Sequence, residues 1–282
     1  MSLLYVSGLL SALASAIVWG SGDFPGGIAA RRSTQYQVVA LAALSGLVAL
    51  TLLALGRHES IPPFTSIVWA GLAGLSGAIG MAALYLGLAT GRSAMIAPTS
   101  AVVAAALPVV VGSLLDGFPC WLRIAGMAAG MVGIWLVSKP GTTGDGQAGG
   151  GLLLGILAGL GFGGFFILIA QVEAGLLFSP LVVAKLTAVC ASVLILVQQR
   201  QSLPTLWSNP MALLAGILDA AGNVLYLLAK QLTRLDIAAV LASMYPAATV
   251  ILSRVLLHEK VSASQWFGVG LCLIGVALIA LG

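Results

Sequence analysis

Long apolar runs cover most of the chain, and short groups of Pro, Gly and charged residues interrupt them. A helix needs about 20 apolar residues to cross about 30 Å of hydrocarbon. Ten runs approach or reach this length, and they predict membrane-crossing helices at residues 3–29, 33–56, 66–89, 93–115, 120–138, 150–171, 179–199, 209–230, 236–257 and 262–281. The loops between them are short, so we expect no separate domain outside the membrane.

The composition agrees with a chain that lies in a lipid bilayer. Of its 282 residues, 60% are hydrophobic and 7% are charged, whereas soluble domains carry roughly a quarter charged residues. The net charge of +4 does not indicate nucleic-acid binding, because no basic cluster is longer than Arg31-Arg32. The three cysteines lie at or inside apolar segments, so we expect no disulfide framework, no metal site and no cofactor.

A linker-like segment near the middle of the chain points to an internal repeat. Residues 139–149 are rich in Gly and Thr, and they separate predicted five-helix units at 1–138 and 150–282. A shift of 142 residues aligns several positions without a gap, namely 72–74 with 214–216, Gly80 with Gly222, Arg92 with Arg234, Gly126 with Gly268 and Gly133 with Gly275. Because five is odd, the second unit enters the membrane from the opposite side. The predicted fold is therefore an all-α integral membrane protein with ten transmembrane helices in two inverted-topology repeats.

Several short motifs resemble the EamA-type domain of the drug/metabolite transporter superfamily. They are Trp19-Gly20-Ser21, Pro246 before Leu257-His258-Glu259-Lys260, and Gln265 with Gly268 and Gly275. The second unit matches better, because Asp116-Gly117-Phe118 stands where the family usually has a Gly-Glu-Arg/Lys turn. The resemblance implies a carrier or exporter of small metabolites, with a central cavity between the halves and termini in the cytoplasm. The distribution of Lys and Arg instead favours termini outside, so the side of the termini stays open.

Asp219 is the first candidate for a functional residue. An ionisable group inside a membrane is costly and is a functional candidate by default. Asp219 lies near the middle of the eighth predicted span, and Asn223, Tyr226 and Lys230 follow it on the same helix face. We expect this face to line a cavity, with Asp219 binding a proton or the solute. The alternative is a structural carboxylate that is hydrogen-bonded to a neighbouring helix.

Four further residues complete the predicted site. Asp23 lies one turn after Trp19 in the first span. Either both residues line the cavity, or the helix ends near Pro25 and Asp23 is exposed to solvent there. Lys185 lies inside the seventh span and either pairs with a solute carboxylate, Asp219 or Asp23, or extends to the headgroups. Tyr245 is an aromatic residue at interior depth that either stacks on an organic solute or only packs against other helices.

These residues predict a secondary, proton-linked transporter or exporter of small organic metabolites, such as amino acids, that works by alternating access. Its expected partners are the solute, protons and the lipid of the cell membrane, with the chain as a monomer or homodimer. No metalloprotease helix, catalytic triad or phosphate-binding loop is present in the sequence, so an enzyme or an ATP-driven pump is not expected. A channel or a structural membrane subunit is the remaining alternative.

Overall fold

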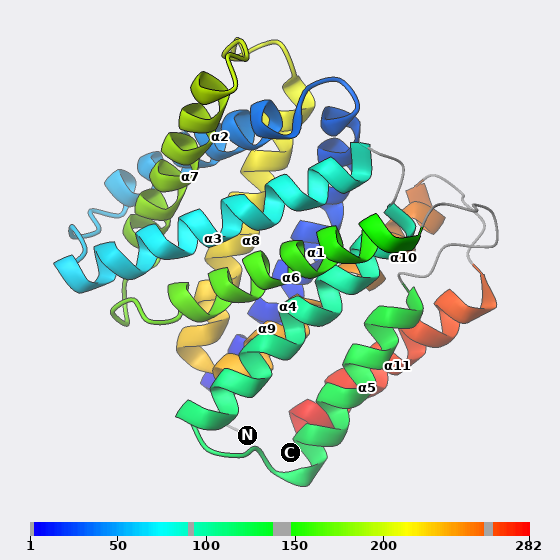
Figure 1. Ribbon diagram of the computed structural model, residues 1–282. Coiled ribbons are helices and arrows are strands. Elements are labelled where there is room, and N and C mark those ends of the chain that lie inside the picture. Colours follow the sequence, from blue (N-terminus) through cyan, green and yellow to red (C-terminus); the bar gives the residue numbers. More distant parts are fainter. Residues whose placement is uncertain (1–2, 90–92, 138–147, 257–261) are drawn as a thin grey trace.

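The computed structural model describes residues 3–89, 93–137, 148–256 and 262–282. Within these ranges the regular secondary structure is entirely α-helical (Figure 1). The helices are α1 (Leu3–Ala30), α2 (Gln35–Gly56), α3 (Phe64–Ala89), α4 (Ser93–Leu115), α5 (Trp121–Val137), α6 (Ala148–Ile169), α7 (Phe178–Gln198), α8 (Pro210–Leu232), α9 (Leu235–Ala242), α10 (Tyr245–Leu256) and α11 (Ala263–Leu281). Most of the linker, Arg92 and the His258-Glu259-Lys260 turn lie outside the described residues.

The helices are of membrane length and composition. Among the described residues, seven helices are long and apolar enough to cross a membrane. Three shorter apolar helices, at Thr99–Leu115, Trp121–Val137 and Leu235–Ala248, fall in the fourth, fifth and ninth predicted spans. The prediction of an all-α membrane protein is confirmed, while the count of ten crossings stays a prediction.

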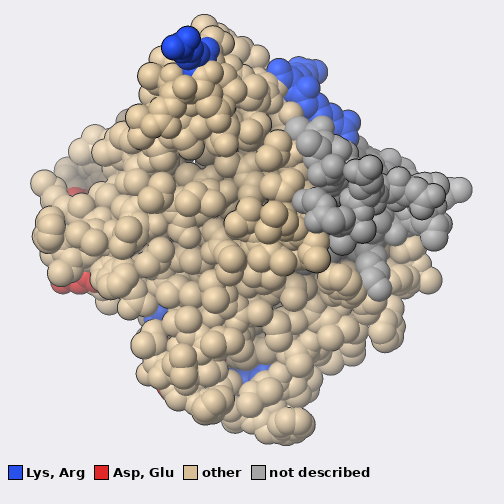
Figure 2. Space-filling view, viewed as in Figure 1, with Lys and Arg blue, Asp and Glu red and all other residues tan. Residues whose placement is uncertain are grey.

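The outer surface suits a lipid environment. Large side chains such as Leu10, Leu52, Leu114 and Leu273 are 61–76% exposed along the helices. Most of the face shown in Figure 2 carries no charge, and its clearest groups of Lys and Arg lie at the upper edge. Exposed apolar area of this extent is expected where lipid, and not water, surrounds the protein.

One helix boundary agrees with the predicted span and excludes an alternative, and another differs from the expectation. Helix α1 does not end near Pro25 but continues through it to Ala30. The ninth predicted span is two helices, because the chain breaks at Ser243 and Met244 between α9 and α10. Pro246 lies in the first turn of α10, where its missing N–H is tolerated, but it cannot continue the hydrogen-bond ladder of α9.

Segments that are distant in sequence meet at two ends of the bundle. At the end that holds both termini, the Tyr5 hydroxyl donates to the carbonyl of Ile279 at 3.2 Å. There Glu59, after α2, also accepts hydrogen bonds from the backbone N–H groups of residues 177–179 at the start of α7. At the other end, Asn209 donates to the carbonyl of Ala29 at 3.0 Å. The loops thus bind α2 to α7 and α1 to α8.

The helices of the two halves pack in reciprocal pairs. Helix α1 packs on α8 and α3 on α6, while α2 packs on α8 and α3 on α7. Helices α5 and α11 run side by side (Figure 1), and glycines bring their backbones together. A Cβ at Gly126 would lie 2.9 Å from the carbonyl oxygen of Gly275, and one at Gly133 would lie 2.8 Å from that of Gly268. Because the earlier glycine of α5 contacts the later glycine of α11 and the reverse, the two helices are antiparallel.

Candidate functional site

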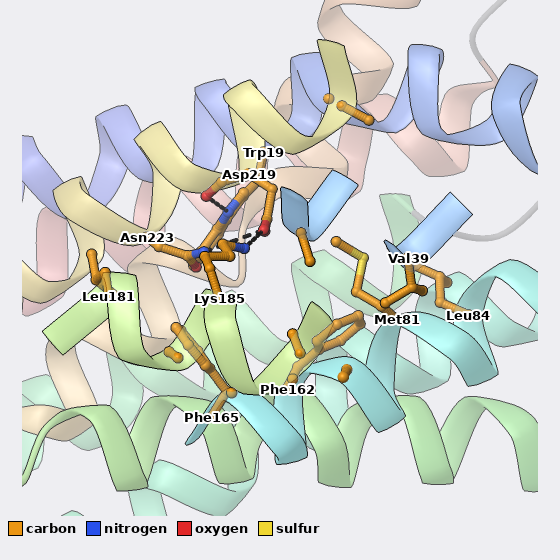
Figure 3. Close-up of a pocket in the computed structure, with 18 of the residues that line it drawn as sticks. Trp19, Val39, Met81, Leu84, Phe162, Phe165, Leu181, Lys185, Asp219 and Asn223 are labelled. Atoms are coloured by element: carbon orange, nitrogen blue, oxygen red, sulfur yellow. Dashed lines mark hydrogen bonds and ion pairs between the residues drawn. The ribbon is translucent and has the colours of Figure 1, made fainter. Parts of the chain in front are cut away.

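A cavity lies between the two halves of the helix bundle (Figure 3). Helices α1, α2, α3, α6, α7 and α8 provide most of its walls, and Tyr245 contributes from the start of α10. Its volume is about 140 Å³, close to the roughly 150 Å³ of an engineered cavity that binds benzene. The cavity is therefore large enough for part or all of a small organic molecule.

Lys185 of α7 and Asp219 of α8 form an ion pair in the cavity wall. The side chains are 12% and 20% exposed, respectively, so each charge is largely shielded but still reaches the cavity. Asn223, one turn along α8, donates from Nδ2 to the same carboxylate oxygen of Asp219 at 3.3 Å. The pairing with Asp219 is one of the alternatives considered for Lys185, and it draws the lysine toward the cavity and away from the headgroups.

Trp19 of α1 contacts the backbone of α8 at Asp219, the acidic member of the ion pair. Its indole Nε1 donates to the backbone carbonyl of Asp219 at 3.3 Å. The close approach of α1 and α8 requires Gly222, because a Cβ there would overlap the Trp19 indole. The hydroxyl of Ser15 also donates to the Gly222 carbonyl at 2.8 Å. These contacts hold the backbone of α8 at Asp219 in a fixed position against α1.

Tyr226 does not line the cavity, in contrast to the expected polar stripe. Its side chain is fully buried, and its hydroxyl donates to the carbonyl of Phe166 at 3.1 Å. The Tyr226 ring stacks on Phe166 with centroids 4.4 Å apart, and Trp19 stacks on both rings at 5.6 and 6.2 Å. Tyr226 therefore packs behind the cavity wall and links α8 to α6 through Phe166.

The other predicted residues fall in different places. Tyr245 lines the cavity, as do Trp19, Lys185, Asp219 and Asn223. Lys230, the last member of the expected stripe, lines a separate pocket near the end of α8. The side chain of Asp23 lies outside the described residues.

Much of the cavity wall consists of residues that sequence reasoning did not select. Phe162, Phe165 and Phe166 of α6 face the cavity, and none of them is among the predicted site residues. Their spacing of i, i+3 and i+4 places them on one helix face, and this was the signal that could have found them. The opposite wall is apolar and comes from α2 and α3, where Val39 and Met81 lie near Leu84 (Figure 3).

A second ion pair lies outside the cavity, at the start of α9. Asp236 is the first residue of the ninth predicted span, where an interfacial side chain is expected, but its side chain is fully buried and pairs with Arg234 at 3.0 Å. The Arg234 guanidinium also donates to the carbonyls of Asp116 and Gly117, at 3.0 and 2.6 Å, in the loop between α4 and α5. Arg234 thus joins the two halves at the end of the bundle that holds the termini.

The site suits non-covalent binding of a solute. In the described part of the chain, no group of three or more His, Cys, Asp or Glu side chains is placed to hold a metal ion. The charged and amide side chains of the cavity are Lys185, Asp219 and Asn223. They offer a cation, an anion and an amide within an otherwise apolar and aromatic wall.

Comparisons with known proteins agree with this architecture. The EamA-like transporter family matches residues 149–281, and no protein of curated function matches the chain. One crystal structure aligns with 98% of this chain and 97% of its own, with a TM-score of 0.75 and 19% sequence identity. At this identity the alignment establishes a shared fold, and it extends across both halves of the chain.

The family match confirms the resemblance that the sequence motifs indicate. EamA-like proteins belong to the drug/metabolite transporter superfamily, and the apolar helices described above are those of a protein that crosses the membrane several times. We conclude that the chain is an integral multi-pass protein of the cell membrane, and that its second half, residues 149–281, matches the EamA-like transporter family.

Proposed function

We propose that the protein is a proton-linked secondary transporter of small organic solutes such as amino acids, and that Asp219 is the site at which solute and proton compete. The observation that carries this proposal is the ion pair of Lys185 and Asp219 in the wall of an otherwise apolar cavity. Charged groups inside a membrane are costly and mark the paths of solutes and ions.

The ion pair favours a solute that carries both charges. A solute with a carboxylate alone would draw Lys185 away and leave Asp219 without its partner. A solute with an amine alone would draw Asp219 away and leave Lys185 without its partner. An unpaired charge in a largely shielded site is strongly destabilising. A zwitterion leaves no charge unpaired, because its ammonium group binds Asp219 while its carboxylate binds Lys185. Amino acids have this chemistry.

Proton coupling follows from the same pair. When Asp219 takes up a proton, it loses its attraction for Lys185 and for a solute ammonium group. Proton binding and solute binding at Asp219 are then mutually exclusive, which is the requirement for exchange of one against the other. Asn223 stabilises the ionised carboxylate by donating a hydrogen bond to it.

Reciprocal contacts support two inverted halves as the moving parts. The 142-residue shift relates Gly126 to Gly268 and Gly133 to Gly275, and the close contacts are Gly126 with Gly275 and Gly133 with Gly268. Two-fold symmetry produces such crossed contacts. Because the two helices are antiparallel, the axis is perpendicular to them and lies in the membrane plane, as in inverted repeats.

A second set of crossed contacts occurs beside the cavity. A Cβ at Gly74 of α3 would overlap the backbone of Ala184 on α7, and one at Gly216 of α8 would overlap that of Ala42 on α2. The same 142-residue shift relates Gly74 to Gly216 and Ala42 to Ala184. Rocking of one half against the other would open the cavity to the two sides of the membrane in turn.

Transport into proteoliposomes tests the proposal. The purified protein is reconstituted, and uptake of a mixture of radiolabelled amino acids is measured with and without an imposed pH gradient. We expect saturable uptake that the gradient accelerates, and we expect Asp219→Asn to lose the acceleration. Glu173→Gln serves as the control, because Glu173 is exposed in the loop between α6 and α7, away from the cavity.

The assay also separates a transporter from the alternatives. A carrier exchanges labelled for unlabelled solute across the membrane and shows no unitary currents. Stepwise conductance in a planar bilayer would favour a channel. No uptake of any amino acid, with or without a gradient, would contradict the proposed solute class.

A further inference from the structure

The two ends of the cavity differ in chemistry. The charged and amide side chains come from α7 and α8, whereas α2 and α3 contribute apolar side chains and the hydroxyl-bearing Tyr85. Figure 3 shows Lys185, Asp219 and Asn223 grouped together, with Val39, Met81 and Leu84 on the other side of the space. A solute that fills this cavity meets charge at one end and hydrocarbon at the other.

The 142-residue shift relates the charged residues to small ones in the first half. Ala43 corresponds to Lys185 and Gly77 corresponds to Asp219, and all four line the cavity. The second half places the charged side chains of Lys185 and Asp219 at the cavity, whereas the first half has only a methyl group and a hydrogen atom at the corresponding positions. The contrast makes the cavity polar on one side and open to an apolar group on the other.

Gly77 is small for a reason other than helix packing. At Gly74, one turn earlier, an added Cβ would overlap the backbone of Ala184, so that glycine is needed for the contact between α3 and α7. At Gly77 an added Cβ would lie 3.4 Å from the ring of Phe165, which is an ordinary van der Waals contact. The protein could therefore accommodate alanine at residue 77, and the missing side chain leaves space within the cavity.

We propose that the solute binds in one orientation, with its charged groups at Lys185 and Asp219 and its apolar part against α2 and α3, and that Ala43 and Gly77 set the largest apolar part the site accepts. This inference rests on the proposed function, because it specifies which members of the zwitterionic class fit. Each methyl group added at these positions removes space that the apolar part of the solute would fill, and close-packed sites do not absorb such volume freely.

Competition against uptake of one labelled solute tests the orientation and the size limit. Alanine, valine, leucine and phenylalanine serve as unlabelled competitors for radiolabelled alanine in proteoliposomes that hold wild type, Ala43→Val or Gly77→Ala. We expect both variants to lose affinity for leucine and phenylalanine by about tenfold or more, because a single methylene changes affinity in an apolar pocket by about tenfold or more. The affinity for alanine should stay within about twofold of wild type. Ala277→Val is the matched control, because Ala277 is exposed on α11 outside the cavity.

The outcomes distinguish this inference from the proposed function. If wild type takes up alanine and the variants keep the wild-type preference for large competitors, the size limit lies elsewhere and the inference is wrong while the transport proposal stands. An equal loss for all four competitors would also contradict it, because a defined orientation predicts a loss that grows with the apolar part. If wild type takes up no radiolabelled alanine, the proposed solute class fails first.

Discussion

The ammonium group of Lys185 on α7 pairs with the carboxylate of Asp219 on α8, and both side chains reach a cavity that is otherwise mostly apolar and aromatic. Trp19 fixes the backbone of Asp219 from the opposite side through a hydrogen bond of 3.3 Å. The first prediction follows from this pair. Asp219→Asn and Lys185→Met each leave one charge without its partner, so each variant should lower the apparent Tm of the purified protein.

The double variant Lys185→Met/Asp219→Asn removes both charges. It should recover at least half of the Tm lost in the worse single variant, because no unpaired charge remains, and it should still lack gradient-accelerated uptake. A double-mutant cycle of Tm values measures the coupling. Additive losses of Tm in the double variant would contradict a direct energetic interaction between the two residues.

Tyr226 should contribute to stability and not to solute binding. It is fully buried and donates to the carbonyl of Phe166, so Tyr226→Phe removes one buried hydrogen bond at a cost of about 1 kcal/mol. The KM for a transported amino acid should stay within about twofold of wild type, whereas Asn223→Ala, in the cavity wall, should raise it about tenfold, which corresponds to about 1.4 kcal/mol. A larger KM effect at Tyr226 than at Asn223 would contradict the placement of these two residues.

The Arg234–Asp236 pair should hold the end of the bundle together. Asp236→Asn leaves the guanidinium without its charged partner and should cost about 1–3 kcal/mol, below the full cost of an unpaired buried charge because Arg234 is partly exposed. The hydrogen bond to Asp236 raises the pKa of Arg234. Arginine is protonated well above neutral pH already, so the raised pKa keeps it charged and adds no pH dependence of its own near neutrality.

Thermal unfolding in detergent measures the effect of Asp236→Asn. Asp116→Asn is the control, because the exposed Asp116 side chain makes only a smaller electrostatic contribution to Arg234 than Asp236 does, and Arg234 contacts the Asp116 backbone carbonyl, which asparagine keeps. Equal Tm values for the two variants would show that the buried pair does not stabilise this end.

The glycines of α5 and α11 should be required for the contact between these helices. A Cβ at Gly133 would lie 2.7 Å from the sulfur of Cys272 and 2.8 Å from the carbonyl oxygen of Gly268. Gly133→Ala should therefore destabilise the protein by about 1–3 kcal/mol through overpacking. At Gly270, on the same pair of helices, nothing lies within 4 Å of the added atom, so Gly270→Ala should leave the apparent Tm unchanged or raise it. A loss of similar size at both positions would indicate that helix contact is not the cause.

The sequence predicted the helices and two of the charged residues of the site, but not the depth of the cavity. Tyr226 shares a helix face with Asp219, yet seven residues correspond to about 10 Å along the helix axis. At that distance Phe166 covers the face, and the cavity has ended. Periodicity gives the direction of a side chain around a helix, whereas the extent of a cavity depends on helices that are distant in sequence.

Other features depended on tertiary contacts in the same way. The sequence left Lys185 several partners, and only the tertiary arrangement, in which α2 packs against both α7 and α8, brings it to Asp219. The break between α9 and α10 falls at Ser243 and Met244 and not at the proline that signals it. The burial of Asp236 could not be predicted, because in the sequence a charged residue at a span end resembles an interfacial residue. Its partner, Arg234, lies only two positions earlier and is also at the span end.

Solute-driven proton movement tests the central claim most directly. Proteoliposomes with a trapped pH dye receive an amino acid on the outside, and the internal pH is followed together with uptake of the labelled amino acid. With wild type, we predict a pH change that begins with uptake and saturates at the same solute concentration, and with Asp219→Asn we predict no pH change, even where solute exchange persists. The same pH change in both proteins would contradict the assignment of Asp219 as the site that couples solute to proton.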